Sequence, residues 1–138
     1  MSDQTSIRSP RSKSYWAGWV LSGMVIAFLV MDFTIKLMGL PVVLSTTGGL
    51  GYPATAEFAL RLGILQLVCT ALYVAPRTAV LGAILLTGYL GGAVATHVRV
   101  GSPLFSHVLF GAYLGLIVWG GLYLRDPRIR ALIPLRAA

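Results

Sequence analysis

Four long apolar runs, separated by short segments that contain glycine or proline, dominate the pattern of hydrophobic and polar positions along the chain. An α-helix of about 20 residues crosses the hydrocarbon layer of a bilayer, and each run is close to that length. Glycine and proline between the runs end one helix before the next begins. The pattern predicts an all-α fold, a transmembrane four-helix bundle, with helices over residues 15–38, 54–75, 78–98 and 104–124.

The links between the predicted helices are short enough to define their arrangement. Pro76 separates the second helix from the third, and Gly101-Ser102-Pro103 separates the third from the fourth. Short connections make consecutive helices antiparallel neighbours, so the simplest arrangement is up-down-up-down. Outside the bundle, residues 1–14 are polar and rich in serine, which predicts a disordered tail, and residues 126–138 form a basic tail.

Composition indicates a bilayer as the surroundings of this chain. Hydrophobic residues make up 57% of the 138 residues, charged residues make up 11%, and the mean hydropathy is +0.81. The surface of a soluble domain has to be far more polar. The sequence therefore predicts one membrane domain over residues 15–125, with the lipid bilayer as its first partner. Because Cys69 is the single cysteine, a disulfide within the chain is excluded.

Lysine and arginine are distributed unevenly over the two ends of the predicted bundle. An excess of these residues marks the cytoplasmic side of a membrane protein, so both termini are predicted to be cytoplasmic. Most of the net charge of +7 comes from the basic end. Because the basic residues flank helices and do not form one surface, we predict no nucleic-acid partner. The basic end carries Arg8, Arg11, Lys13, Arg77, Arg125, Arg128, Arg130 and Arg136, and the other end carries Lys36, Arg61 and Arg99.

Two acid–base pairs lie inside or beside the apolar runs. Asp32 and Lys36 are four residues apart, as are Glu57 and Arg61, so each pair shares one face of a helix. Ionisable groups in a membrane are costly unless they are paired or face a cavity, which makes them site candidates. Since one loop joins the two helix ends, we predict that the four residues form one salt-bridge network at the outer mouth of the bundle.

Further polar residues extend this predicted site. Gln66, Tyr89 and Tyr113 are expected near the middle of the membrane, and they are interpreted either as interhelical hydrogen-bonding groups or as the lining of a ligand site. His97 and His107 are expected at the outer mouth. Their spacing matches no recognised metal motif, so no metal site is predicted.

Two segments around the site have unusual composition. The connection over residues 39–53 is apolar, rich in glycine and without charge, so it is interpreted either as a lid over the mouth or as a segment partly inserted at the membrane surface. Small residues also recur at intervals of four on the third and fourth helices, a pattern typical of close helix packing. They are Gly88, Gly92 and Thr96, and Gly111 and Gly115.

Several short motifs, in this order and spacing, resemble the DoxX-like family of small four-helix membrane proteins. The resemblance covers about residues 17 to 125. Gln66 stands where the family frequently has glutamate, a departure that weakens an inherited role in proton transfer at this position. The motifs are Lys36-Leu37 with Gly39, Gly51-Tyr52-Pro53, Leu62-Gly63-Ile64-Leu65-Gln66, Pro76, and Thr96-His97.

The resemblance implies a protein of the bacterial inner membrane with a possible quinone ligand or redox partner protein. We favour a membrane-embedded binding or accessory subunit whose charged outer pocket holds a quinone or a lipid-like molecule. The alternative is a redox-linked quinone oxidoreductase subunit that uses Asp32, Lys36, Glu57, Arg61 and His97 for proton transfer. A transport function would require a homo-oligomer, because four short helices offer little room for a pathway.

Overall fold

A computed structural model describes residues 11–133, and all regular structure in this range is helical. Four helical segments are long and apolar enough to cross a membrane: Lys13–Leu37, Ala56–Val74, Ala79–Arg99 and Leu104–Arg125. The predicted all-α fold with four membrane-spanning helices is confirmed. The elements in chain order are α1 (Lys13–Leu37), α2 (Pro41–Gly49), α3 (Ala56–Val74), α4 (Ala79–Arg99), η1 (Leu104–Val108), α5 (Phe110–Arg125) and α6 (Pro127–Leu132).

Local sequence explains where several of these helices begin. The Ser12 hydroxyl accepts a hydrogen bond from the Tyr15 amide at 3.4 Å, so Lys13 and Ser14, predicted to lie in a disordered tail, already belong to α1. The first ten residues of that predicted tail lie outside the described range. At the other end, α6 occupies part of the basic tail, while residues 134–138 lie outside the described range.

Two segments differ from the simple helix–loop pattern of the sequence prediction. The connection over residues 39–53 contains α2, which begins with Pro41 at a position where proline is favoured because its missing N–H costs no hydrogen bond. The fourth span, predicted as one helix from residue 104, begins instead with the π-helical turn η1. There the Leu109 amide donates to the Leu104 carbonyl at 2.9 Å, five residues back, which inserts one residue into the turn.

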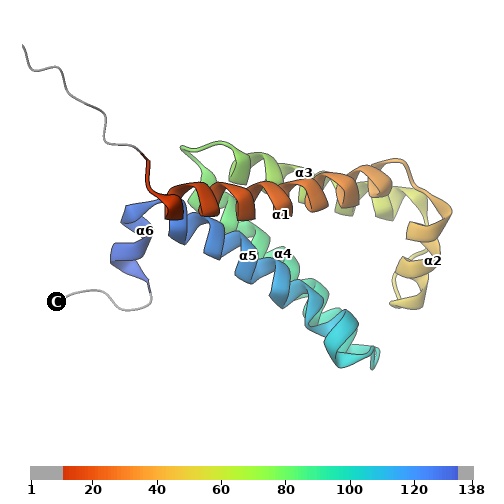
Figure 1. Cartoon of the computed structure of the whole chain (residues 1–138). Coiled ribbons are helices and arrows are strands. Elements are labelled where there is room, and N and C mark those ends of the chain that lie inside the picture. Colours follow the sequence, from red (N-terminus) through yellow and green to blue (C-terminus); the bar gives the residue numbers. More distant parts are fainter. Residues whose placement is uncertain (1–10, 134–138) are drawn as a thin grey trace, which may run out of the picture.

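The four long helices form a ring in which α1 packs against α3 and α5, and α4 packs against the same two helices. Figure 1 shows that the α1–α3 pair and the α4–α5 pair meet near α6 and diverge toward α2. We call this arrangement the wedge. Its closed end is filled by buried side chains, and its open end faces α2 and η1.

Tyr73 ties three helices together at the closed end of the wedge. Its side chain is fully buried on α3, and its hydroxyl donates to the Val118 carbonyl of α5 at 2.8 Å. The same hydroxyl lies 3.0 Å from the Ser22 hydroxyl of α1. Apolar side chains that include Val25, Leu86 and Leu122 fill the space around it. The hydroxyls of Tyr73 and Ser22 are thus satisfied within an apolar core that joins α1, α3 and α5 at the closed end of the wedge.

Glycines set the closest helix approaches, although not at all the positions that the sequence pattern indicated. A Cβ atom on Gly18 of α1 would lie 2.8 Å from the Gly121 carbonyl of α5, and one on Gly82 of α4 would clash with the backbone of Tyr73 on α3. The prediction of close packing at Gly88, Gly92 and Gly115 is wrong, since a Cβ at any of them would meet no atom within 4 Å. The predicted contact at Gly111 is present, because its Cβ would lie 2.9 Å from the Leu90 carbonyl.

Candidate functional site

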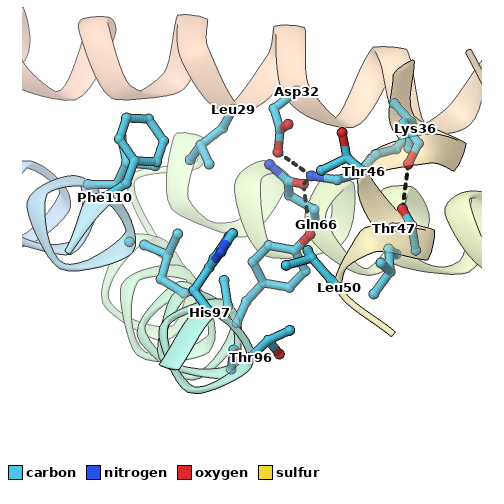
Figure 2. Close-up of a pocket in the computed structure, with 18 of the residues that line it drawn as sticks. Leu29, Asp32, Lys36, Thr46, Thr47, Leu50, Gln66, Thr96, His97 and Phe110 are labelled. Atoms are coloured by element: carbon cyan, nitrogen blue, oxygen red, sulfur yellow. Dashed lines mark hydrogen bonds and ion pairs between the residues drawn. The ribbon is translucent and has the colours of Figure 1, made fainter. Parts of the chain in front are cut away.

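A cavity of about 570 Å³ occupies the open part of the wedge. All four spans contribute to its walls, and α2 and the loop after it line its outer end. Figure 2 shows Asp32 and Lys36 on α1, His97 and Thr96 on α4, and Thr46 and Thr47 on α2 arranged around the same space. Gly88 and Gly92 of α4 also line the cavity, so the small residues that were expected to pack helices together instead leave room between them.

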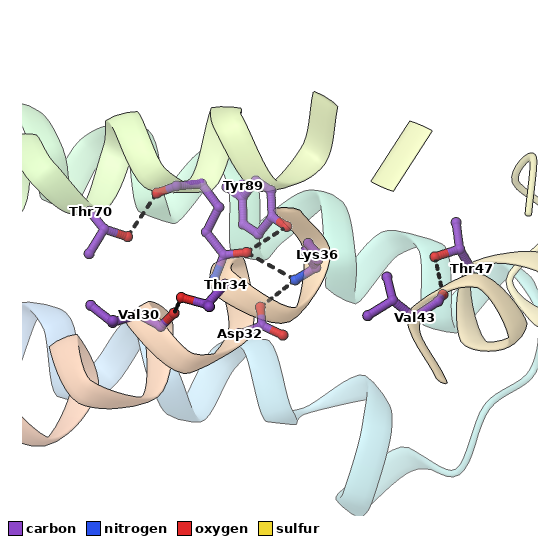
Figure 3. Close-up of polar contacts among 9 residues, drawn as sticks. Val30, Asp32, Thr34, Lys36, Val43, Thr47, Thr70 and Tyr89 are labelled. Carbon is purple, nitrogen blue, oxygen red and sulfur yellow. Dashed lines mark hydrogen bonds and ion pairs between the residues drawn. The ribbon is translucent and has the colours of Figure 1, made fainter. Parts of the chain in front are cut away.

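Gln66 of α3 lies at the centre of the polar contacts in this cavity (Figure 2). Figure 3 shows Asp32, Lys36 and Tyr89 pointing toward the same space. The Lys36 ammonium donates to the Gln66 amide oxygen at 2.9 Å and also to the Asp32 carboxylate. The Tyr89 hydroxyl of α4 donates to the same amide oxygen at 3.1 Å. Lys36 of α1 and Tyr89 of α4 therefore share one acceptor on α3. These hydrogen bonds join the α1–α3 pair to the α4–α5 pair of the wedge.

The contact with Lys36 determines how the Gln66 amide is oriented. An ammonium group has only donors, so the amide has to turn its oxygen toward Lys36 and its NH2 group away. Gln66 is fully buried, and its amide nitrogen has no hydrogen-bond partner among residues 11–133. A buried donor without an acceptor costs about 1 to 3 kcal/mol. The site thus holds a polar group that an acceptor in the cavity would satisfy.

Asp32 and Lys36 form a shielded ion pair. Their side chains are 26% and 17% exposed, and they lie one helical turn apart on α1. The pair brings no net charge into the cavity when both groups are ionised. Lys36 has three N–H donors, of which two are used by Asp32 and Gln66, so one further donor is left for a ligand.

The outer mouth of the cavity is lined by the two histidines. The His97 and His107 rings stand edge to face with centroids 5.7 Å apart. His97 Nδ1 lies 2.9 Å from the Ser102 hydroxyl, and His107 Nδ1 lies 2.7 Å from the Ser106 hydroxyl. Each ring therefore has one nitrogen engaged by a neighbouring serine. Among residues 11–133 no cluster of three or more metal-ligating side chains is present.

The chain that follows α2 is fastened to α4. The Tyr52 hydroxyl lies 3.0 Å from the Thr96 hydroxyl, and Arg99 donates to the Leu50 carbonyl at 2.6 Å. Gly51, between these two contacts, has a φ of +82°, a conformation that favours glycine. These contacts keep α2 beside the cavity, where Val42, Val43, Thr46 and Thr47 contribute to its lining.

Six of the nine predicted site residues line this cavity: Asp32, Lys36, Gln66, Tyr89, His97 and His107. Three do not. Glu57 and Arg61 pair with each other on the surface, with side chains 71% and 73% exposed, and Tyr113 is 42% exposed. The predicted network of four charges is wrong. Arg61 and Glu57 precede Gln66 by five and nine residues, which turns them about 140° and 180° away from it around α3.

Sequence reasoning missed several residues of the mouth, chiefly Leu50, Tyr52, Thr96 and Ser102. Of these, Thr96 and Tyr52 stand in the family-like motifs, but the motifs alone carry no information on their partners. Gly88 and Gly92 line the cavity, but the sequence did not distinguish them from glycines that pack against a neighbouring helix.

Comparison with known proteins gives one family. The sequence profile described as the DoxX-like family matches residues 20–121, which is well over half of the chain and includes every residue of the polar contacts described above. Searches of curated proteins and of solved structures give no significant match.

Proposed function

The chain belongs to the DoxX-like family, and from this premise we propose that it is an integral membrane protein that binds a small amphipathic molecule, a quinone or a lipid-like compound, in the cavity of the wedge. The observation that carries the proposal is the amide donor of Gln66, which has no partner among residues 11–133 and is buried beside Lys36 in a cavity with mostly apolar walls. Small-molecule sites typically combine apolar walls with a few convergent polar groups in about 300 to 1,000 Å³.

The chemistry of the donors indicates the kind of head group. Gln66 Nε2 and the third N–H of Lys36 both donate, so the ligand head has to present oxygen acceptors. A quinone carbonyl or a lipid ester carbonyl fits these donors. The apolar walls, which include Leu29, Phe110 and Leu114, suit a hydrocarbon ring or tail.

Binding fits the site better than proton transfer does. The group at the centre is an amide, which does not titrate, and the Asp32 carboxylate is already engaged by Lys36. We therefore place the redox-linked oxidoreductase subunit second. His97 and Asp32, which line the same cavity, are the residues that such a reaction would use.

Ligand binding is expected to depend on Gln66 and not on Arg61. A decyl-substituted benzoquinone and a monoacylglycerol, each added to purified protein, test the two ligand classes. At a concentration 100 times its Kd, a bound ligand stabilises the folded state by about 2.7 kcal/mol, which thermal unfolding in detergent would detect. Gln66→Leu removes the donor and should abolish the shift, whereas Arg61→Ala, on the exposed face of the same helix, should retain it.

The two variants also show what would contradict the proposal. Each shift has to be measured against the same variant without ligand, because Gln66→Leu alters stability by itself. A ligand-induced shift that is equal in wild type, Gln66→Leu and Arg61→Ala would place the ligand outside the wedge. No shift with either compound class would contradict binding of quinones and lipid esters in this cavity.

We further propose that the basic end of the bundle faces the cytoplasm and that α2 faces the periplasm of a bacterial inner membrane. A reporter that is active only in the periplasm, fused after Ser102, should be active, and the same reporter fused after Arg77 should be silent. These positions lie at opposite ends of α4, so they report independently of the termini. The reverse pattern would show that the basic end faces the periplasm. The end of the cavity near α2 would then face the cytoplasm.

A further inference from the structure

Arg125 lies at the opposite end of the bundle from the cavity, and no acceptor among residues 11–133 forms a hydrogen bond or an ion pair with its guanidinium. It is the last residue of α5, beside the start of α1 (Figure 1). Its guanidinium carbon lies 4.3 Å from the centre of the Trp19 ring and 5.3 Å from the centre of the Tyr73 ring. The two aromatic side chains hold the guanidinium in place by cation–π contacts.

One edge of this guanidinium is unsatisfied. Arg125 Nε and Nη2 are buried, and neither has a hydrogen-bond partner among residues 11–133. These two nitrogens carry parallel N–H bonds, through which arginine can donate two hydrogen bonds to one carboxylate or phosphate. Buried N–H donors without an acceptor are costly, and this edge of the partly buried Arg125 side chain has the geometry to bind an oxyanion.

The carboxylate next to it in sequence is not that oxyanion. Asp126 accepts hydrogen bonds from the Arg128 amide at 2.9 Å and from Arg128 Nε and Nη2 at 3.2 Å. The hydrogen bonds from the Arg128 side chain lower the pKa of Asp126, with smaller contributions from its backbone amide and from the charges of Arg128 and Arg125, so the carboxylate stays ionised and committed to Arg128. The other two carboxylates of the described residues, Asp32 and Glu57, pair with Lys36 and Arg61.

A second cavity, of about 440 Å³, opens beside Arg125. Tyr15, Trp19, Leu122 and Arg128 are among its lining residues, and the guanidinium of Arg11 lies 4.9 Å from the Tyr15 ring. Tryptophan and tyrosine at the end of a membrane span mark the level of the lipid head groups. The cavity is therefore bounded by aromatic rings, by Arg125 and Arg128, and by the Asp126 carboxylate that Arg128 already engages, at the depth where phospholipid phosphates lie.

We propose that this cavity binds the phosphodiester of an anionic phospholipid, held through two hydrogen bonds by Nε and Nη2 of Arg125. The lipid supplies an acceptor that residues 11–133 do not provide, and the basic residues around the cavity favour a head group with net negative charge over a zwitterionic one. The site shares no lining residue with the cavity of the wedge and does not depend on the ligand proposed there.

The experiment measures lipid binding to the purified full chain by native mass spectrometry, with phosphatidylglycerol and phosphatidylcholine of equal chain length as probes. Both lipids carry the phosphodiester that Arg125 would hold, so Arg125→Gln should weaken the binding of both by about tenfold, the size of effect given by hydrogen bonds to charged groups. The wild type should in addition prefer phosphatidylglycerol by about fivefold, because a basic residue near the head groups attracts a lipid with net negative charge. Arg130→Gln removes an equal charge from an exposed position of α6 and should keep the wild-type affinity for the phosphodiester.

Two further measurements test the site: binding to the Arg125→Lys variant and competition by inorganic phosphate. Arg125→Lys retains the positive charge but cannot grip a phosphate with two parallel N–H bonds, so it should bind the lipid more weakly than wild type while folding normally. Equal losses in the Arg130→Gln and Arg125→Gln variants would show general attraction to negative charge and overturn the site. Full displacement of the lipid by millimolar inorganic phosphate would also overturn it, since a free anion would then be the better ligand.

Discussion

Replacing Gly82 with alanine is expected to destabilise the bundle by about 3 kcal/mol or more, the upper end of the cost of overpacking a tight core. The added Cβ would overlap the backbone nitrogen of Tyr73 and lie 2.7 Å from the carbonyl carbon of Leu72. Both neighbours are backbone atoms of α3, so no side-chain rotation can relieve the overlap. The two helices would have to separate at the closed end of the wedge, where Tyr73 links α3 to α1 and α5.

Gly91→Ala is the matched control on the same helix. A Cβ at Gly91 would meet no atom within 4 Å, and the residue does not line the cavity. Alanine is the better helix former, so this substitution should leave stability unchanged or raise it slightly. The measurement is the free energy of unfolding by titration with a denaturing detergent. Equal stability of the Gly82→Ala and Gly91→Ala variants would mean that α3 and α4 are not in close contact at Gly82.

The sequence was sufficient to predict the four spans, because the property that defines a membrane helix is local. A run of about 20 apolar residues satisfies both the thickness of the bilayer and the hydrogen-bonding needs of the backbone. The same runs did not distinguish which glycines pack against a neighbour. Gly82 and Gly88 both lie on α4 among similar apolar residues in the sequence. Only Gly82 lies in close contact with a neighbouring helix. That difference depends on how far the α1–α3 helix pair diverges from the α4–α5 helix pair, which is a property of the whole bundle.

The wedge and its cavity could not be derived from helix boundaries alone. The divergence of the α1–α3 pair from the α4–α5 pair begins at a core that joins distant segments, such as Ser22, Tyr73 and Val118. The helix α2 was missed for a different reason. Its nine residues include two glycines and three threonine or serine residues, which have low helix propensity, and its stability comes from contacts with the spans.

For the site, spacing along a helix identified the ion pairs but not their surroundings. Both pairs, Asp32 with Lys36 and Glu57 with Arg61, have the same four-residue interval and both are formed. Only the first faces the cavity, because it shares a face of α1 with Leu29, while the second lies on the side of α3 away from Gln66. The four-residue interval determines whether two side chains on one helix form a pair. The rotation of the helix about its axis determines whether that pair faces the cavity or the surface.

The shielded pair should therefore behave differently from the exposed pair when charges are removed. Lys36→Met leaves the Asp32 carboxylate without a counter-ion and removes a donor from Gln66, and Asp32→Asn leaves the Lys36 ammonium uncompensated. Breaking a buried pair in this way costs about 3 to 5 kcal/mol, whereas replacing both partners costs much less. The double variant Asp32→Asn with Lys36→Met should thus be more stable than Lys36→Met alone. The free energy of unfolding of the four proteins gives the coupling directly.

Glu57→Gln, Arg61→Met and their double variant form the control cycle. These side chains are more than two-thirds exposed, so each single change should cost no more than about 1 kcal/mol and the double should be nearly additive. Additive losses at Asp32 and Lys36 as well would mean that water reaches both groups and screens them. In that case Gln66 would also have access to water, its amide nitrogen would not lack a partner, and the main argument for a ligand in the wedge would fail. A strong coupling at Asp32 and Lys36 alone would show that the cavity is dry at the depth of Gln66, the condition under which one hydrogen bond to a ligand carbonyl contributes most to binding.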